Sequence, residues 1–305
     1  MQIYLPIAEM PLDLFLLLGM GTAVGVLSGM FGIGGGFIVT PLLMFLGIPP
    51  LIAVGTGTSQ VVASSVSGAV GHWQRGNIDL RMGVLLLAGG LVGSLSGVGL
   101  QRLLKALGQL DLFISITYVL MLGVVGGLMF IESLRAIRHG AGQARPSRRR
   151  GSQHTWVQGL PLKLRFRSSK LYISAIPPVV IGALVGWLTA IMGVGGGFLL
   201  VPALIYLLRV PTRLAIGTSV FQIVFVTAFT TVMQSFQNHN VDVLLALPLM
   251  LGGVVGAQFG VNIVHRLNAE QLRIMMAILV ISVALRMAFD LTLRPPDLFN
   301  LDTRP

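Results

Sequence analysis

The amino-acid sequence predicts an all-α polytopic membrane protein. The chain is 54% hydrophobic and only 10% charged, whereas soluble domains usually carry about a quarter charged residues. Apolar stretches of about 20 residues, the length that crosses a bilayer, recur along most of the 305 residues. A glycine-rich element also occurs twice, as GMFGIGGGFIVTP and AIMGVGGGFLLVP. These observations together predict two homologous five-segment repeats, with short broken or re-entrant helices at the glycine clusters.

Ten apolar segments are expected, five on each side of a basic stretch. From these segments we predict membrane repeat one at 1–131, a basic cytoplasmic linker at 132–172, membrane repeat two at 173–290 and a C-terminal tail at 291–305. The ten segments fall at about 12–30, 33–47, 52–71, 83–100, 112–131, 173–191, 195–208, 214–235, 243–264 and 272–289.

The positive charge of the chain is concentrated in the linker. Ten of the 21 Lys and Arg residues lie between Arg135 and Lys170. Basic loops stay on the cytoplasmic side during membrane insertion, so this topology explains the net charge of +11 without a nucleic-acid partner. The expected partners are the lipid bilayer and a small anion, and the sequence leaves the oligomeric state open.

The two halves match beyond the glycine element. AVGTGTSQ (53–60) aligns with AIGTSVFQ (215–222), and GNID (76–79) aligns with HNVD (239–242), at an offset between 161 and 163. We interpret this as an internal duplication. An odd number of crossings per half would make the repeats inverted, as in many transporters, and an even number would make them parallel.

Other glycines are spaced for close helix packing. Small residues four apart let helix backbones approach closely in lipid. We therefore expect tight helix pairs at three sets of positions: Gly21, Gly25 and Gly29; Gly89, Gly93 and Gly97; Gly252, Gly256 and Gly260.

The repeated cluster itself predicts an anion site. Glycines permit backbone conformations closed to other residues, and the helix that follows presents unpaired N–H groups and the positive end of its dipole. Two such helix starts that converge would surround an oxyanion without a formal cation. The candidate residues are Gly34, Gly35 and Gly36 with Gly195, Gly196 and Gly197.

A polar helix follows each cluster and extends the predicted site. Thr56 and Gln60 are four residues apart and share a helix face, as do Thr218 and Gln222. We expect these four side chains to supply neutral donors to the same anion, with cross-helix hydrogen bonds as the structural alternative. Ser64 and Ser67 extend the polar face in the first half only, where Val226 and Phe229 stand in the second.

Few titratable side chains accompany this site. His72 is the best candidate for proton coupling, although an interfacial histidine beside Trp73 is the simpler interpretation. Asp79 and Asp242 are expected to cap the helices that follow them. With no cysteine and scattered histidines, we expect no metal site, no cofactor and no enzyme activity.

The sequence resembles the sulfite exporter TauE/SafE family, also called the four-toluene-sulfonate uptake permease family. The resemblance rests on the duplicated G-x-GGGF…P element, the A-[VI]-G-T-x-x-x-Q stretch, the G/H-N-[IV]-D turn and the two-half layout. It implies a multi-pass protein of the cell inner membrane that carries sulfite, sulfoacetate or other sulfonates. We expect export from the cytoplasm; the alternatives are an anion channel, or an uptake permease for an organic anion with proton coupling through His72.

Overall fold

The computed structural model describes residues 2–31, 34–138, 163–166, 169, 171–264 and 269–293. The chain forms two compact units. Unit 1 comprises Met1–Asp111 and Arg145–Leu267, and unit 2 comprises Leu112–Ala144 and Asn268–Pro305. Unit 1 therefore interleaves the two halves of the sequence, and it contains every predicted site residue.

Ten helices account for most of the described residues, and each overlaps one predicted apolar segment. Four stretches are long and apolar enough to cross a membrane (80–106, 110–128, 213–238 and 243–260), and shorter apolar helices accompany them. The helices are α1 Leu14–Phe31, α2 Gly36–Phe45, α3 Pro50–Gln74, α4 Leu80–Ala106, α5 Leu110–Arg138, α6 Ile176–Met192, α7 Gly197–Tyr206, α8 Thr212–Met233, α9 Val243–Val264 and α10 Ala269–Leu293. One π-helical turn, Gln234–Asn238, continues α8.

Two β-hairpins are present that the sequence analysis did not predict. β1 (Gln2–Leu5) pairs antiparallel with β2 (Met10–Asp13), and β3 (Lys163–Phe166) pairs antiparallel with β4 (Leu171–Ser174). Each strand has only four residues, too few for a clear alternating pattern. The second hairpin lies mostly in the predicted linker (132–172), and β4 runs two residues past its predicted end. Residues 139–162 of that linker are outside the described residues, as is the tail from 294.

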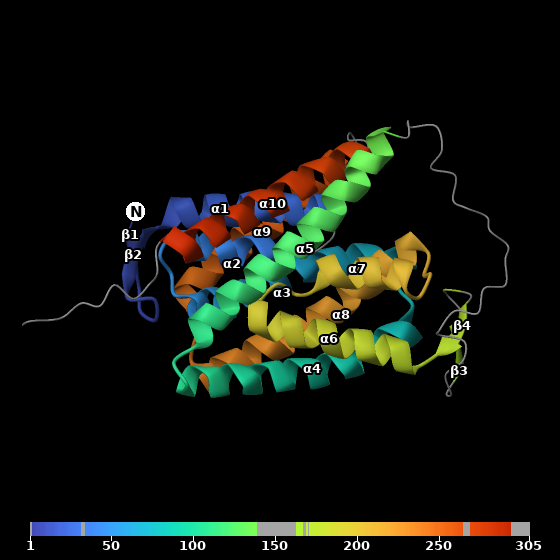
Figure 1. The fold of residues 1–305 in the computed structure, drawn as a ribbon, viewed down its shortest axis with the longest axis horizontal. Helices are drawn as coiled ribbons and strands as arrows, with labels where there is room; N and C mark the ends of the chain where they lie inside the picture. The colour runs from blue at the N-terminus through green and yellow to red at the C-terminus, as the bar shows by residue number, and fades with distance from the viewer. Residues whose placement is uncertain are drawn as a thin grey trace, which may run out of the picture. The chain divides into compact units, whose positions relative to one another are not determined.

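The tight helix pairs predicted from glycine spacing are confirmed. α1 lies along α9, and α4 lies along α6 (Figure 1). A β-carbon at Gly21 would lie 2.7 Å from the carbonyl oxygen of Leu249, and one at Gly97 would lie 2.8 Å from that of Trp187. Any larger side chain would therefore push these backbones apart. Both pairs join a helix of the first half to a helix of the second.

The hairpins are tied to opposite ends of unit 1 by two aspartates. Asp242 Oδ2 accepts hydrogen bonds from the backbone N–H groups of Ile7 (3.0 Å) and Ala8 (3.4 Å), in the β1–β2 turn. Asp79 Oδ2 accepts from the backbone N–H (3.0 Å) and the hydroxyl (2.6 Å) of Ser169, between β3 and β4. Figure 1 shows the two hairpins at the two ends of this unit.

The same aspartates cap helices, as predicted. Asp79 Oδ1 accepts a hydrogen bond from the N–H of Met82 in α4 (3.3 Å), and Asp242 Oδ1 accepts from Leu244 (3.0 Å) and Leu245 (3.2 Å) at the start of α9. Both carboxylates are almost completely buried. Their hydrogen bonds offset the cost of that burial.

Unit 2 is a pair of helices, α5 from Leu112 onward and α10. Gly126 lies against Val280 and Ile281, where an added β-carbon would be 2.9 Å and 3.0 Å from their side chains. The contact repeats, on a smaller scale, the close approach of helices at glycine.

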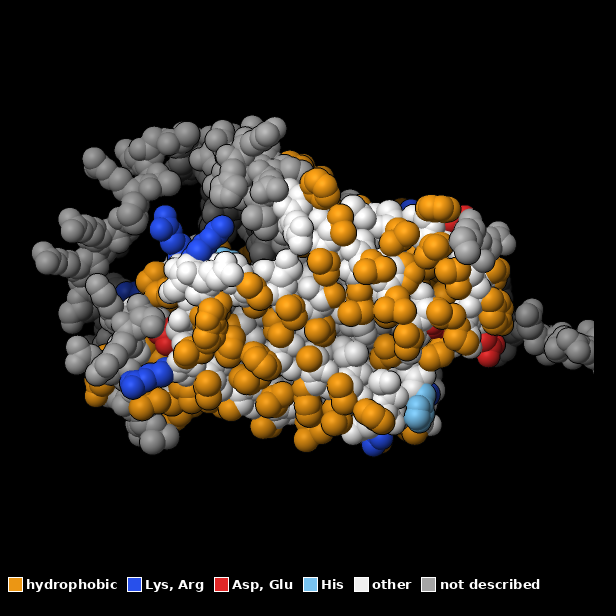
Figure 2. Space-filling view, turned by 180° about the vertical axis from the view of Figure 1, so that it is seen from behind, with side chains coloured by type: hydrophobic (Ala, Val, Ile, Leu, Met, Phe, Trp, Pro, Cys, Tyr) orange, Lys and Arg blue, Asp and Glu red, His pale blue; other side chains and the backbone are white. Residues whose placement is uncertain are grey.

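Large apolar side chains cover much of the surface. Figure 2 shows hydrophobic side chains spread over the middle of one face, with Lys, Arg, Asp and Glu toward the ends. Leu95, Leu184 and Phe259 each expose more than half of their area. Such a surface is unfavourable in water and suits contact with lipid.

Candidate functional site

Both glycine clusters adopt backbone conformations that require glycine. Gly35, directly before α2, has φ of 70°, and Gly196, directly before α7, has φ of 71°. Gly34 and Gly195 also have positive φ. L-residues with side chains rarely adopt these angles. The chain therefore breaks at each cluster and starts a ten-residue helix, about 15 Å long and too short to span a bilayer.

The two breaks meet in the interior of unit 1. The rings of Phe37 and Phe198, in the first turns of α2 and α7, have centroids 5.9 Å apart. A β-carbon at Gly36 would lie 2.7 Å from the carbonyl oxygen of Gly193. Val61 of α3 lies against both Gly34 and Gly195. The predicted convergence of two helix starts is thus present in the structure.

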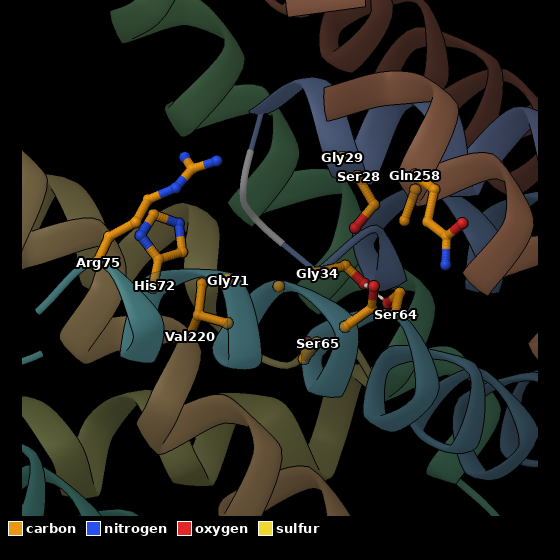
Figure 3. Close-up of a pocket in the computed structure, with 13 residues that line it drawn as sticks. Ser28, Gly29, Gly34, Ser64, Ser65, Gly71, His72, Arg75, Val220 and Gln258 are labelled. Carbon is orange, nitrogen blue, oxygen red and sulfur yellow. Dashed lines mark hydrogen bonds between the residues drawn. The ribbon is translucent and has the colours of Figure 1, made fainter. Parts of the chain in front are cut away.

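A cavity of about 350 Å³ opens beside the first break. It reaches from the Gly34 carbonyl to the end of α3, and Val220 of α8 forms part of its wall (Figure 3). The thirteen described residues that line it include one arginine, one histidine and no carboxylate. They are Ser28, Gly29, Gly34, Ser64, Ser65, Ser67, Gly68, Gly71, His72, Arg75, Val220, Ala257 and Gln258.

Hydroxyl groups surround the inner part of the cavity. The Ser64 hydroxyl donates to the carbonyl oxygen of Gly34 (3.2 Å) and is also 3.2 Å from the Val61 carbonyl. Ser65 Oγ is buried without a hydrogen-bond partner, and Ser28 of α1 lies close to Gly35. Serine hydroxyls donate hydrogen bonds without carrying charge, so they suit an oxyanion in a partly dry pocket.

The mouth of the cavity is cationic. His72 and Arg75, at the C-terminal end of α3, lie together on one side, away from the serines (Figure 3). The Nδ1 atom of His72 is buried and has no partner. Arg75 is exposed, so its permanent charge can attract an anion from solution.

Two glutamine side chains, predicted as site residues, are buried without hydrogen bonds. Neither Oε1 nor Nε2 has a partner in Gln60 or in Gln222, and both residues are at least 99% buried. Gln60 lies against Gly253 of α9, and Gln222 lies against Gly90 of α4. An unsatisfied buried polar group costs about 1–3 kcal/mol, so four such atoms at two matching places call for an explanation in function.

The two predicted threonines each accept a hydrogen bond from another element, which is the structural alternative stated for them. Thr56 Oγ1 accepts a hydrogen bond from the backbone N–H of Asp242 (3.2 Å), and Thr218 Oγ1 accepts one from that of Asp79 (3.0 Å). Thr56 and Gln60 do share a helix face, but at Thr56 that face packs on the turn before α9. The threonines therefore hold turns in place, and the structure does not bring them to the cavity.

The glycines before the threonines explain the rest of this motif. A β-carbon at Gly55 would lie 2.8 Å from the carbonyl oxygen of Asn240, and one at Gly217 would overlap that of Asn77. Each G-T pair thus receives the N-x-D turn of the other half of the sequence. The two repeated motifs are parts of one contact, made twice.

Sequence reasoning missed several lining residues. Ser28 comes from α1 and Gln258 from α9, and no local pattern links them to the glycine break. Arg75 directly follows the last residue of α3. Ser64 and Ser67 were signalled by the polar face of α3. Within the described ranges, no three His, Cys, Asp or Glu side chains are grouped to hold a metal ion.

Comparison with known proteins agrees with this architecture. The family model for the sulfite exporter TauE/SafE matches residues 17–287. The chain belongs to the TauE/SafE family. TauE/SafE proteins are membrane transporters rather than enzymes, and the matched range covers both glycine breaks and the cavity.

Relatives of this TauE/SafE chain include bacterial proteins that it covers almost completely. A probable membrane transporter protein of Xylella fastidiosa is 29% identical over 278 residues, which cover 90% of this chain and 94% of the relative. The probable membrane transporter protein YunE of Bacillus subtilis is 24% identical over 285 residues, covering 90% and 97%. A sulfite exporter TauE/SafE family protein 3 of Arabidopsis thaliana is 30% identical over 97 residues, 32% of this chain and 20% of the relative. No solved structure matches the chain significantly.

Proposed function

We propose that this protein transports small sulfur-containing anions, such as sulfite, sulfoacetate or other sulfonates, and exports them from the cytoplasm through the cell inner membrane. One observation carries the proposal: the serine-lined cavity, with Arg75 and His72 at its mouth, ends at the glycine break before α2. A sulfonate or sulfite offers several acceptor oxygens, which hydroxyl, amide and backbone N–H donors can bind.

The buried polar atoms without partners support a path through this region. In the described part of the chain they include Thr40 Oγ1, Ser59 Oγ and the side chains of Gln60 and Gln222. These residues lie on α2, which begins at the first glycine break, and on α3 and α8, the next helices after α2 and α7. Inside a membrane protein, polar atoms without protein partners can form hydrogen bonds with a polar ligand that passes them. We propose Gly34–Gly36 and Gly195–Gly197 as the lining of this path and Gln60 and Gln222 as its side-chain donors, with Thr56 and Thr218 positioning the helices.

The direction of the cavity fits export. The cavity is at the end of unit 1 where Ser169, from the hairpin in the basic linker, binds Asp79. With the linker in the cytoplasm, the cavity faces inward and receives cytoplasmic anions. An inside-negative potential favours outward movement of each negative charge by about 2.3 kcal/mol per 100 mV. Export therefore needs no coupled ion.

Inverted repeats are part of the same proposal. β1–β2 precedes α1 and β3–β4 precedes α6, and these matching segments lie at opposite ends of unit 1 (Figure 1). α2 and α7 match in length, in the positive φ of the preceding glycine and in an internal proline, Pro41 and Pro202. These pairs support an internal duplication in opposite orientations, with 1–131 and 173–290 as the repeats.

Proton-coupled uptake is the second candidate, because His72 lines the cavity with Nδ1 buried and unpartnered. The deciding experiment measures sulfite flux in proteoliposomes under a membrane potential and a pH gradient imposed separately, with sulfoacetate as competitor. Export predicts saturable flux driven by potential alone and retained in His72→Gln. Flux driven only by the pH gradient, and lost in His72→Gln, would establish coupling instead. Flux that does not saturate would indicate a channel, and no flux of either anion would overturn the substrate class.

A further inference from the structure

Four buried amide side chains join five segments near the start of α3 and the end of α8. The first cavity, in contrast, lies toward the end of α3. Gln101 of α4, Gln234 and Asn238 of the π-helical turn, and Asn240 of the following loop are each at least 94% buried. Their hydrogen bonds also reach the carbonyl oxygens of Ala190 in α6 and Leu51 in α3. These groups have no part in the function proposed above.

The amides form one continuous network. Gln234 Nε2 donates to Gln101 Oε1 (2.8 Å) and to the Ala190 carbonyl (3.0 Å), and Gln101 Nε2 donates to the same carbonyl (2.9 Å). Gln234 Oε1 accepts from Asn238 Nδ2 (3.2 Å) and Asn240 Nδ2 (2.5 Å). Ala190 is in the last turn of α6 and five residues before Gly195, so the network reaches the helix that leads into the second glycine break.

A second cavity, of about 340 Å³, borders this network. Asn238 and Asn240 line it, together with Leu51 and Ile52 at the start of α3. Its titratable groups are Lys105, Asp111 and His239. Residues of α3 from Ser64 onward line the first cavity. About 11 residues of α3, or roughly 16 Å of helix, therefore separate the linings of the two cavities.

The sequence offset locates the origin of the π-helical turn. Gln222 follows Gln60 by 162 residues, whereas Asp242 follows Asp79 by 163. The second half therefore holds one extra residue between these positions, and a single inserted residue converts a helical turn to a π-turn. At an offset of 162, Gln234 stands where the first half has His72. The end of α3, at His72, lines an open cavity. The matching end of α8, at Gln234, is part of a closed hydrogen-bond network.

We propose that Gln101, Gln234, Asn238 and Asn240 form a gate that closes the path between the glycine breaks and the second cavity, which is the other mouth of that path. The inference rests on the transport function proposed above. Amides suit a gate because each is both donor and acceptor. They can exchange one another for water or a passing oxyanion without exposing an unpaired charge.

The absence of cysteine from the natural chain gives a direct test. Ser67→Cys marks the first cavity and Ile52→Cys marks the second. Each is labelled with a membrane-impermeant maleimide in right-side-out and inside-out vesicles, without substrate. The two introduced thiols are expected to react from opposite sides. Reaction of both from the same side would overturn the assignment of two mouths.

The gate is tested by Gln234→Ala added to Ser67→Cys. The loss of its hydrogen bonds is expected to raise the labelling rate of the thiol at position 67 from the second-cavity side by about tenfold. Gln237→Ala is the matched control, because its amide donates to Met233 Sδ rather than to the network. Asn238→Ala is a second gate variant should Gln234→Ala fold poorly, with thermal unfolding as the check on both.

Unchanged labelling in both folded gate variants, or an equal rise in Gln237→Ala, would overturn the gate. Because labelling needs no substrate, failure of sulfite transport would leave this result intact and would count only against the proposed function.

Discussion

The aromatic rings of Phe37 and Phe198 lie 5.9 Å apart, each in the first turn of a helix that begins at a glycine break. More than 160 residues separate them in sequence, and their contact brings the two breaks together. The chemistry proposed for this protein depends on that meeting, and the following variants test the residues around it.

Gly196→Ala is expected to disturb the second break. A side chain at φ of 71° is strained, and the new β-carbon would collide with Val185. We expect a loss of about 1–3 kcal/mol in the free energy of unfolding, with a marked fall in anion flux. Gly99→Ala is the control, because nothing lies within 4 Å of its added β-carbon. Equal behaviour of the two variants in thermal unfolding and flux would contradict the requirement for glycine.

Arg75→Gln is expected to weaken capture of the anion. Arg75 supplies the permanent positive charge among the residues that line the first cavity. Flux at low substrate concentration should fall by about three- to tenfold, and the remaining flux should depend less on ionic strength. Arg102 is at an exposed position of α4 and does not line the first cavity. Arg102→Gln should therefore leave the flux and its dependence on ionic strength unchanged. A similar fall in the two variants would point to overall charge rather than to this residue.

Gln60→Leu tests an amide on the proposed path that makes no hydrogen bond. The Gln60 amide has no hydrogen bond to lose, so the apolar replacement should leave stability unchanged or raise it by about 1 kcal/mol, while flux falls. Gln101→Leu is the contrast, because its amide donates to the Ala190 carbonyl and its removal should cost about 1–3 kcal/mol. Thermal unfolding and flux are measured on the same preparations. Full flux in Gln60→Leu would remove this residue from the path.

Asp79→Asn and Asp242→Asn are expected to release the hairpins. Each substitution turns a charged acceptor of several hydrogen bonds into a neutral group with fewer acceptor positions. The expected loss is about 1–3 kcal/mol of stability for each. Asp290→Asn, at an exposed position of α10, serves as the control. If proteolysis near residue 169 does not increase in Asp79→Asn, the attachment of the second hairpin does not depend on this carboxylate.

Sequence reasoning located the helices well because apolar runs and glycine spacing act locally. The ten segments and the tight pairing at Gly21 and Gly97 follow from lipid exposure and from backbone approach. For Thr56, the sequence left two interpretations open, an anion donor and a structural hydrogen bond to another element. Its spacing to Gln60 defines a helix face, but only the folded chain shows that the turn at Asp242 covers one part of that face.

The cavity shows the same limit. Ser64 belongs to a polar face that sequence reveals, whereas Ser28 and Gln258 reach the cavity only through the packing of α1 and α9. The hairpins escaped notice because four-residue strands carry little pattern. What binds them is a pair of buried carboxylates more than 80 residues away in sequence.

The bond between Ile7 and Asp242 joins residues 235 positions apart. Ribosomes add about 5–20 residues per second, so the first hairpin emerges roughly 10–50 s before its acceptor is synthesised. The first half of the chain is therefore synthesised while the turn at Ile7 still lacks its hydrogen bond to Asp242. Its attachment can form only after Asp242 has been synthesised, so an event late in the synthesis of the second half fixes the first hairpin.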